Sequence, residues 1–162
     1  MLSLQQEVDM PHDQRLQVLD LHMAAENAHD LARTLATLTA DCEFVDGGLG
    51  MRWSGHDGAA AHYRMWWDAF DVQVAGERLH LAEASAVAET TWTGTHVGTF
   101  AGVAATQLPV EFTVAVVVEF RDGLMASERF FWDTASLARQ LGVATFDVVD
   151  DRAAASAGGR SA

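Results

Sequence analysis

EFTVAVVVEFRDGLMASERFFWDTASLARQLG, residues 111–142, is the stretch that decides the fold. Apolar and polar residues alternate on both sides of the RDG sequence at 121–123, a pattern typical of two antiparallel strands joined by a tight turn. The segment after Asp133 has helical spacing and stops at Gly142, so we expect a short closing helix with Asp133 as its N-cap. The length of the turn then fixes which residues share a face of the hairpin.

Two turn lengths are compatible with this sequence. A two-residue loop (122–123) would pair Val117 with Glu128, whereas a three-residue loop (121–123) with a glycine bulge pairs Val116 with Glu128. The second leaves one face almost entirely apolar, so it is the register we expect. That face carries Phe112, Val114, Val116, Val118, Phe120, Leu124, Ala126, Glu128, Phe130 and Trp132. It therefore holds a single carboxylate, Glu128, among apolar neighbours.

Length and composition predict one globular domain. The chain has 162 residues, 49% of them hydrophobic, which suffices for a sizeable core. We expect the domain to span residues 11–149, between a loosely ordered N-terminus (1–10) and a flexible tail (150–162). The elements before the hairpin read as helices at 11–28, 30–39 and 57–70, and strands at 41–46, after 71 and at 86–99. A glycine-rich connection spans 47–58.

Charge and cysteine content limit the classes of binding partner and the cellular compartment that we expect. The net charge of −13 argues against nucleic acid and anionic membranes, which would repel such a surface. No apolar run is long enough to cross a membrane, and the N-terminus has neither the basic nor the apolar region of a signal peptide. A single cysteine, Cys42, excludes an internal disulfide. We therefore expect a cytoplasmic protein.

Helices followed by antiparallel strands predict an α+β fold, with helices on one side of a curved sheet around an apolar pocket. On the helix at 57–70, Tyr63, Trp66 and Phe70 share one face; this stripe is explained by core packing, and a pocket wall is the functional alternative. On the strand at 86–99, Trp92 and His96 point to the same side.

Two segments, GTHVGTFAGVAATQLPVEFTVAVVVEFRDG (94–123) and ERFFWDTASLARQLG (128–142), resemble the SnoaL-like polyketide cyclases of the nuclear transport factor 2-like superfamily. The resemblance implies a cone-shaped α+β barrel with a strongly curved, mainly antiparallel sheet. It also implies N-terminal helices that close an apolar pocket, and a homodimer. His96 matches the GxHVG motif of that family.

The resemblance also shows departures at the positions that carry the family's chemistry. The cyclases use an aspartate on the last strand, where this chain has Phe130, and a histidine on the preceding strand, where it has Val116. The last aspartate of the related limonene-epoxide hydrolases also falls at Phe130. Neither mechanism therefore carries over intact.

The remaining acid–base candidates are Glu128 and His96, with Asp46 as a possible second carboxylate at the pocket mouth. Burial disfavours the charged form of an isolated carboxyl and so raises its pKa. A carboxyl with a raised pKa suits proton abstraction next to a carbonyl. A structural role for Glu128, at the pocket rim or paired with His96, is the alternative. The other histidines are expected at the surface. No His or Cys cluster and no phosphate-binding loop is visible, so we expect neither a metal nor a nucleotide cofactor.

Large apolar side chains would hold the ligand. The expected substrate-binding residues are Trp92, Phe130, Trp132, Val116, Val114, Tyr63, Trp66 and Phe44. The hypothesis is a cofactor-independent cyclase, isomerase or lyase for a small hydrophobic, aromatic or polyketide-like molecule. The alternatives are a non-catalytic binding protein that uses the same pocket, and an epoxide hydrolase. Apolar residues on the outer face, Val117 and Phe131, predict a homodimer.

Overall fold

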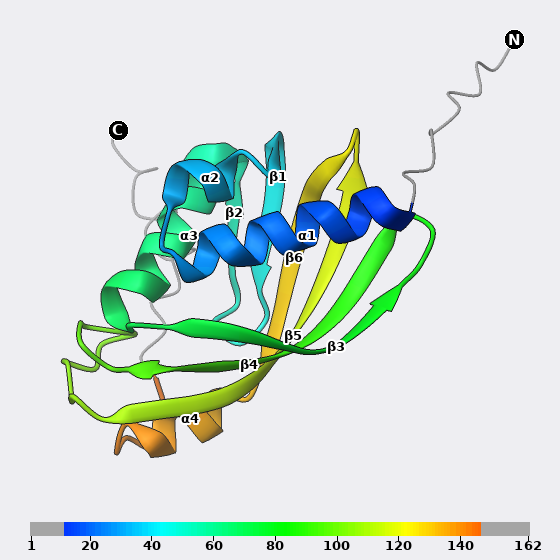
Figure 1. Cartoon of the computed structure of the whole chain (residues 1–162). Helices are drawn as coiled ribbons and strands as arrows, with labels where there is room; N and C mark the ends of the chain where they lie inside the picture. Colours follow the sequence, from blue (N-terminus) through cyan, green and yellow to red (C-terminus); the bar gives the residue numbers. More distant parts are fainter. Residues whose placement is uncertain (1–11, 147–162) are drawn as a thin grey trace, which may run out of the picture.

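The structure, a computed structural model, describes residues 12–146. Six strands form one curved sheet in the order β2-β1-β6-β5-β4-β3, with helices packed mainly on its concave side (Figure 1). The helices are α1 (His12–Asn27), α2 (Leu31–Leu35), α3 (Gly55–Ala69) and α4 (Thr134–Gln140). The strands are β1 (Leu38–Asp46), β2 (Met51–Ser54), β3 (Gln73–Leu81), β4 (Ser85–Thr95), β5 (Pro109–Arg121) and β6 (Leu124–Trp132).

The predicted α+β class is confirmed, and the sheet curves without closing on itself. β2 and β3 are its two edges. All neighbouring strands are antiparallel except β1 and β6, which run parallel in the middle of the sheet. The ends at 1–10 and 150–162, expected to be loosely held, lie outside the described residues. Within residues 12–146, no helix combines the length and the hydropathy that crossing a bilayer requires.

The β5–β6 turn is shorter than predicted. Arg121 pairs with Leu124, so the loop is the two residues Asp122 and Gly123. Both have positive φ, 54° and 80°, as a type I′ turn requires. This turn matches the right-handed twist of the two strands, and it explains why the predicted three-residue loop is wrong.

The extra residue of the hairpin lies further along β6. Phe120 pairs with Met125 and Glu119 with Ser127, which leaves Ala126 as a bulge. The bulge shifts the inward face by one residue, just as a bulge in the turn would have done. Beyond residue 126, the residues of β6 that were predicted to face inward do so. Their partners on β5 differ from the prediction.

Glu128 consequently faces the core, as the alternation of the sequence predicted, but opposite Val118 instead of Val116. Met125 takes the inward place near the turn that was predicted for Leu124 and Ala126. Glu128 is 3% exposed. Its carboxylate is thus buried in the middle of the sheet.

Two elements near the N-terminus differ from the prediction. The second helix ends at Leu35, and β1 begins at Leu38 because the backbone there pairs with Met125 of β6. The glycine-rich connection contains a short edge strand, β2, paired with β1. Gly48 lies against the indole of Trp132, so closely that a Cβ at that position would collide with it. Gly48 therefore allows this segment to pack closely against Trp132.

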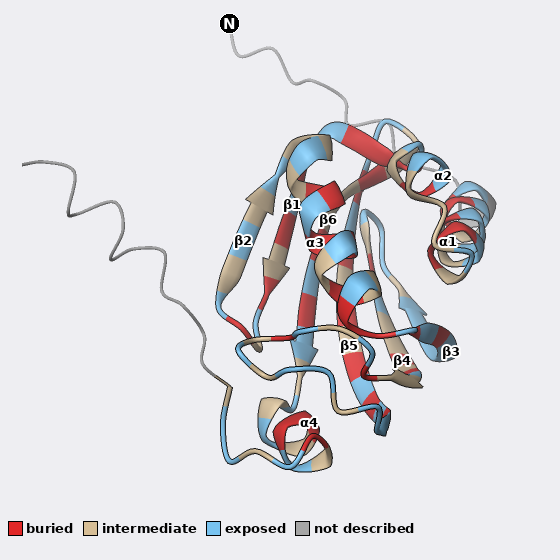
Figure 2. Ribbon diagram, turned by 90° about the vertical axis from the view of Figure 1, so that its left-hand side faces the viewer, coloured by how far each residue is buried: buried red, intermediate tan, exposed pale blue. Residues whose placement is uncertain are grey.

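The core fills the concave side of the sheet. Buried and exposed residues alternate along the strands (Figure 2), with Val110, Phe112, Val114, Val116, Val118 and Phe120 facing inward on β5. Trp66 of α3 lies at its centre, 5.3 Å from Trp92 and 4.7 Å from Phe100 between ring centroids. The aromatic stripe of α3 thus packs the core, as the simpler interpretation held. α1 crosses the remaining part of the concave face (Figure 1).

Candidate functional site

A cavity of about 280 Å³ lies between α1 and the inner face of β3 to β6. One wall is the sheet, with Trp92, Val116, Glu128 and Phe130 among its residues. The opposite wall is α1, which contributes both apolar and ionisable side chains. The lining residues on α1 are Leu16, Leu19, Asp20, His22, Met23 and Glu26. The cavity is therefore apolar on most of its surface, with a small cluster of polar groups.

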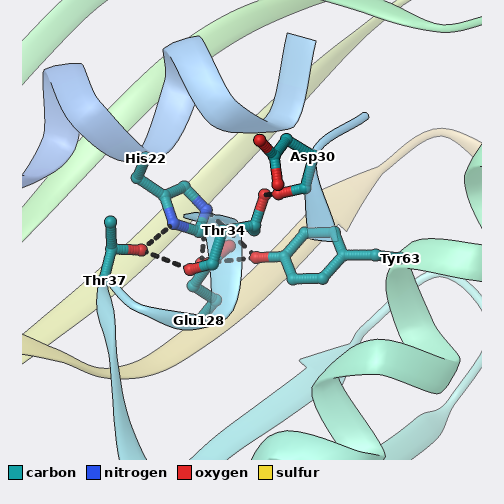
Figure 3. A network of polar contacts seen from close by, with 6 residues as sticks. All are labelled: His22, Asp30, Thr34, Thr37, Tyr63 and Glu128. Carbon is teal, nitrogen blue, oxygen red and sulfur yellow. Dashed lines mark hydrogen bonds and ion pairs between the residues drawn. The ribbon is translucent and has the colours of Figure 1, made fainter. Parts of the chain in front are cut away.

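Glu128 is held by side chains from two helices (Figure 3). Its Oε1 lies 3.1 Å from Nε2 of His22 on α1, and it accepts a hydrogen bond of 3.1 Å from the hydroxyl of Tyr63 on α3. The Tyr63 hydroxyl is also 3.0 Å from Nε2 of His22. No hydrogen bond to Glu128 Oε2 occurs among the described residues, and the side chain lines the cavity. One carboxylate oxygen is thus positioned by the protein and the other faces the cavity.

The tautomer of His22 follows from its second partner. The Thr37 hydroxyl donates to the backbone carbonyl of Thr34 at 2.6 Å, so it can only accept from His22 Nδ1, also 2.6 Å away. Nδ1 therefore carries a proton. Nε2 lies 3.1 Å from a carboxylate oxygen of Glu128, and a second proton on the ring would let it donate to that oxygen. With that proton the pair is an imidazolium beside a carboxylate.

The charge balance favours the imidazolium form. Burial by itself lowers the pKa of His22, but the charge and hydrogen bond of Glu128 and the charge of Glu26 outweigh it and raise the pKa above 6.5. Burial, then the charges of Glu128 and Glu26, raise the pKa of the Tyr63 phenol, so Tyr63 stays a neutral donor. The raised pKa of His22 thus favours an ion pair with Glu128, supported by the Tyr63 hydroxyl.

A second carboxyl, Glu26, lies one helical turn after His22. It is 9% exposed and lines the cavity. Burial raises its pKa to about 7, with the His22 charge opposing the shift and the Glu128 charge adding to it. Glu26 therefore exchanges a proton near neutral pH.

His22 and Glu26 were not predicted as site residues, and the expectation that the remaining histidines lie at the surface is wrong for His22. The buried face of α1 is Arg15, Val18, His22, Ala25 and Glu26. These positions have helical spacing, but three of the five carry ionisable side chains, so hydropathy assigns them to solvent. The apolar stripe of Leu16, Leu19 and Met23 borders the cavity instead. The spacing of polar residues on α1 is the signal that could have identified the site.

His96, the predicted partner of Glu128, has a different environment. Its Nδ1 accepts from the backbone N–H of Thr106 at 3.2 Å, and its ring stacks on Phe70 at 4.9 Å. Burial lowers the pKa of His96, so the ring is neutral. Within residues 14–146 no bond joins it to Glu128, because Thr106 and Phe70 hold the ring at the end of β4. His96 anchors the 97–108 loop, and His22 occupies the place foreseen for it beside Glu128.

Asp46 is buried away from the cavity lining. Its Oδ1 accepts from the Trp132 indole at 2.9 Å and from the backbone N–H of Leu49 at 2.8 Å. Burial raises its pKa, and these hydrogen bonds oppose the shift. Asp46 therefore ties the 47–50 turn to the end of β6, which is a structural arrangement.

The predicted ligand-binding residues lie in three different places. Trp92, Phe130 and Val116 line the cavity. Tyr63 reaches the site through its bond to Glu128. The others, Trp132, Val114, Trp66 and Phe44, pack in the surrounding core.

A buried histidine supports the Phe130 wall from behind. His62 stacks on Phe130 with 4.6 Å between ring centroids, and burial lowers its pKa to about 4 despite the charge of Glu128. It is therefore neutral, and it too contradicts the expectation of a surface histidine. Among the described residues, no group of three or more His, Cys, Asp or Glu is arranged to hold a metal ion.

Comparison with known proteins identifies the family of this chain. The model of the SnoaL-like polyketide cyclase family matches residues 16–141. This chain belongs to that family. Phe130 and Val116, where the resemblance places the cyclases' catalytic side chains, present apolar side chains to the cavity. The polar groups of this member come instead from α1, α3 and Glu128.

Solved structures share the fold at low sequence identity. TsrD from Streptomyces laurentii is 24% identical, with a TM-score of 0.73, over 83% of this chain and 98% of that one. AclR from Streptomyces galilaeus, a proposed hydroxylase, is 22% identical, with a TM-score of 0.72, over 82% and 98%. A proposed SnoaL-like polyketide cyclase from Jannaschia sp. CCS1 is 18% identical, with a TM-score of 0.74, over 82% and 96%. No curated protein matches this chain in sequence.

Proposed function

We propose that this protein is a cofactor-independent enzyme of cyclase or isomerase type, which begins its reaction by moving a proton on a small hydrophobic substrate. The observation that carries the proposal is the buried Glu128, with one oxygen fixed by His22 and Tyr63 and the other directed to an apolar cavity. A carboxylate positioned in this way is a general base for a carbon acid next to a carbonyl.

The chemistry would proceed through Glu128 Oε2. This oxygen takes a proton from the carbon beside the carbonyl, and the electron pair of the C–H bond moves to the carbonyl oxygen as an enolate. In an isomerisation, Glu128 returns the proton to another carbon. In a cyclisation, the enolate carbon attacks a second carbonyl of the same molecule, whose oxygen then takes the proton. His22 stays charged throughout and Tyr63 keeps the carboxylate in position.

The cavity size supports a small substrate. A cavity of about 150 Å³ holds benzene, so a volume of about 280 Å³ suits roughly two fused rings. The walls of Trp92 and Phe130 would bind such rings by burial and aromatic contact.

A non-catalytic binding protein is the second candidate, and one observation favours it. By the resemblance, Phe130 and Val116 stand at the positions of the cyclases' acid–base side chains, and both residues are apolar here. In that case Glu128 would be only a hydrogen-bond anchor. Epoxide hydrolysis is less favoured, because Phe130 also replaces the last aspartate of that chemistry.

Deuterium exchange separates the two candidates. A two-ring ketone such as 2-tetralone is incubated in D₂O with the protein, and the loss of its α-proton signals is followed by NMR. The wild type should accelerate exchange over buffer, and Glu128→Gln should lose that acceleration while binding the ketone. Glu119→Gln, the same change at an exposed site on β5, is the matched control and should behave as wild type. Equal rates for wild type and Glu128→Gln would leave the binding protein as the function.

A further inference from the structure

Glu26 differs from Glu128 in having no hydrogen-bond partner among the described residues. Its side chain is nine-tenths buried and lines the cavity, yet no hydrogen bond to its carboxyl is found within residues 14–146. An ionisable group withdrawn from water in this way is costly unless something pairs with it. His22 is already engaged on both ring nitrogens, by Thr37 and by Glu128. The cavity therefore contains one carboxyl that is open to pairing with a ligand.

The charges around the cavity favour the same kind of ligand. Its interior has two carboxyls, Glu26 and Glu128, against one imidazole, His22. Its lining also includes Asp20 and Glu77, opposed by a largely exposed Arg78. The net potential inside is thus negative, which attracts cations and hydrogen-bond donors and repels anions.

The aromatic walls complete the site. Trp92 and Phe130 lie on the sheet side of the cavity, opposite α1. The Trp92 indole N–H is used internally, since it donates to Thr90 Oγ1 at 3.0 Å. The ring is therefore held in place and offers the cavity a π-face, a surface that favours aromatic rings and organic cations.

We propose that Glu26 is the ligand anchor of this cavity, and that the ligand is an aromatic molecule of about two rings with a protonated amine, or another N–H or O–H donor, directed at Glu26. Glu128 then acts on the bound molecule while Glu26 holds it. The inference rests on the same cavity as the proposed function but does not require turnover. An anionic analogue of the same shape is excluded by the two carboxyls.

Binding of a cation must displace a proton from Glu26. The free group has a pKa of about 7, and a cation beside it favours the ionised form, so the pKa falls on binding. Roughly half a proton per ligand is then released at pH 7. The titratable and charged groups that share the cavity or its polar cluster are Asp20 and His22 on α1, Tyr63 on α3, Glu77 and Arg78 on β3, and Glu128 on β6.

Three probes of one shape test the charge preference. They are 1-naphthylmethylammonium, 1-naphthalenemethanol and 1-naphthoate, titrated into the full-length protein by calorimetry at pH 7 in two buffers of different ionisation enthalpy. We expect the cation to bind about tenfold more tightly than the alcohol, with proton release, and the anion not to bind. Glu26→Gln should lose both the tenfold preference and the proton release, and should still bind the alcohol. Glu119→Gln should match the wild type.

The outcomes separate this inference from the proposed function. If Glu26→Gln keeps the preference for the cation, or if the anion binds as well as the alcohol, the anchor is not Glu26 and the inference is overturned. Binding of the alcohol by Glu26→Gln shows that the variant is folded and its cavity intact. The deuterium exchange assay tests Glu128 and does not depend on Glu26, so its failure would remove the enzyme and leave the ligand class standing.

Discussion

His22 is a charged residue in a place that hydropathy would assign to an apolar one. The hydroxyl of Thr37 fixes its tautomer, and Glu128 supplies the opposite charge. Thr34 extends the chain of hydrogen bonds, since its own hydroxyl donates to the Asp30 carbonyl at 2.8 Å (Figure 3). Backbone carbonyls around α2 thus accept hydrogen bonds from both threonine hydroxyls. Thr37, held in this way, keeps the His22 ring from rotating.

The first prediction concerns the pH dependence of the His22 ion pair. The folded-state pKa of His22 is raised above 6.5, so its contribution to stability is complete below pH 6.5 and is lost as pH rises through the folded pKa. Urea denaturation of wild type and His22→Gln should show the largest difference in unfolding free energy near pH 6 and a smaller one near pH 9. A difference that grows with pH would contradict the ion pair.

Glu26 should have an effect of opposite sign. Its pKa rises from 4.5 to about 7 on folding, so its ionisation opposes folding. This destabilisation is absent below pH 4.5, grows between pH 4.5 and 7, and is constant above that. The shift corresponds to about 3 kcal/mol at 1.36 kcal/mol per pH unit. Glu26→Gln should therefore unfold at a higher urea concentration than wild type at pH 8, and at a similar one at pH 4.5.

The residues of the site show what a single sequence can and cannot reveal. Glu128 could be found, because strand alternation has a period of two and, once the hairpin contains one extra residue, places it on an apolar face. Its partners could not. His22 is about a hundred residues away along the chain, and the charged face of α1 becomes buried only because the sheet curves around it. His96 was favoured by its strand position, but Thr106 and Phe70 hold it.

At the scale of elements, the inward face of the β5–β6 hairpin was predicted correctly, but the pairing of its residues was predicted wrongly. The sequence pattern requires one extra residue somewhere in the hairpin to keep the apolar face continuous. It does not specify where, and the Asp122–Gly123 pair forms a two-residue turn while Ala126 becomes the bulge. The edge strand β2 was missed for a similar reason, because four residues in a glycine-rich segment give too short a pattern to recognise.

The N-terminus of α4 supports a further prediction. Asp133 accepts a hydrogen bond from the Ser136 backbone N–H at 3.1 Å, which confirms it as the N-cap. Asp133→Ala should cost about 1 kcal/mol of unfolding free energy, measured by urea denaturation. Binding of 1-naphthalenemethanol should be unchanged, because Asp133 is not among the residues of the cavity wall. A folded variant that no longer binds the probe would mean that the site extends to this helix.

For the whole molecule we predict a homodimer through the outer face of the sheet. Val87 lies opposite Val117, and Ala115 lies opposite Phe131, in adjacent positions of β4, β5 and β6. Phe131 is 51% exposed and Val87 36% exposed. Exposed apolar side chains that are grouped on the outer face of a sheet are typical of a protein–protein interface.

Light scattering tests the dimer. The wild type should have the mass of two chains at micromolar concentration, and Phe131→Glu that of one, with an unchanged circular dichroism spectrum. Each chain carries a net charge of −13, so salt should strengthen association by screening the repulsion. A wild-type mass of one chain across the concentration range would contradict the interface.

The parallel pairing of β1 with β6 also has a consequence for the time at which the protein can work. Leu38 pairs with Met125, and the cavity joins α1 to Glu128, so both the sheet centre and the site unite the first quarter of the chain with its last quarter. Contacts this distant in sequence form slowly, because a long loop must close before they are gained. On the ribosome, α1 and β1 emerge long before β6, so the buried polar face of α1 has no partner until β6 is made. A ligand consequently cannot assist an incomplete chain, since it has nothing to bind until synthesis has passed Phe130.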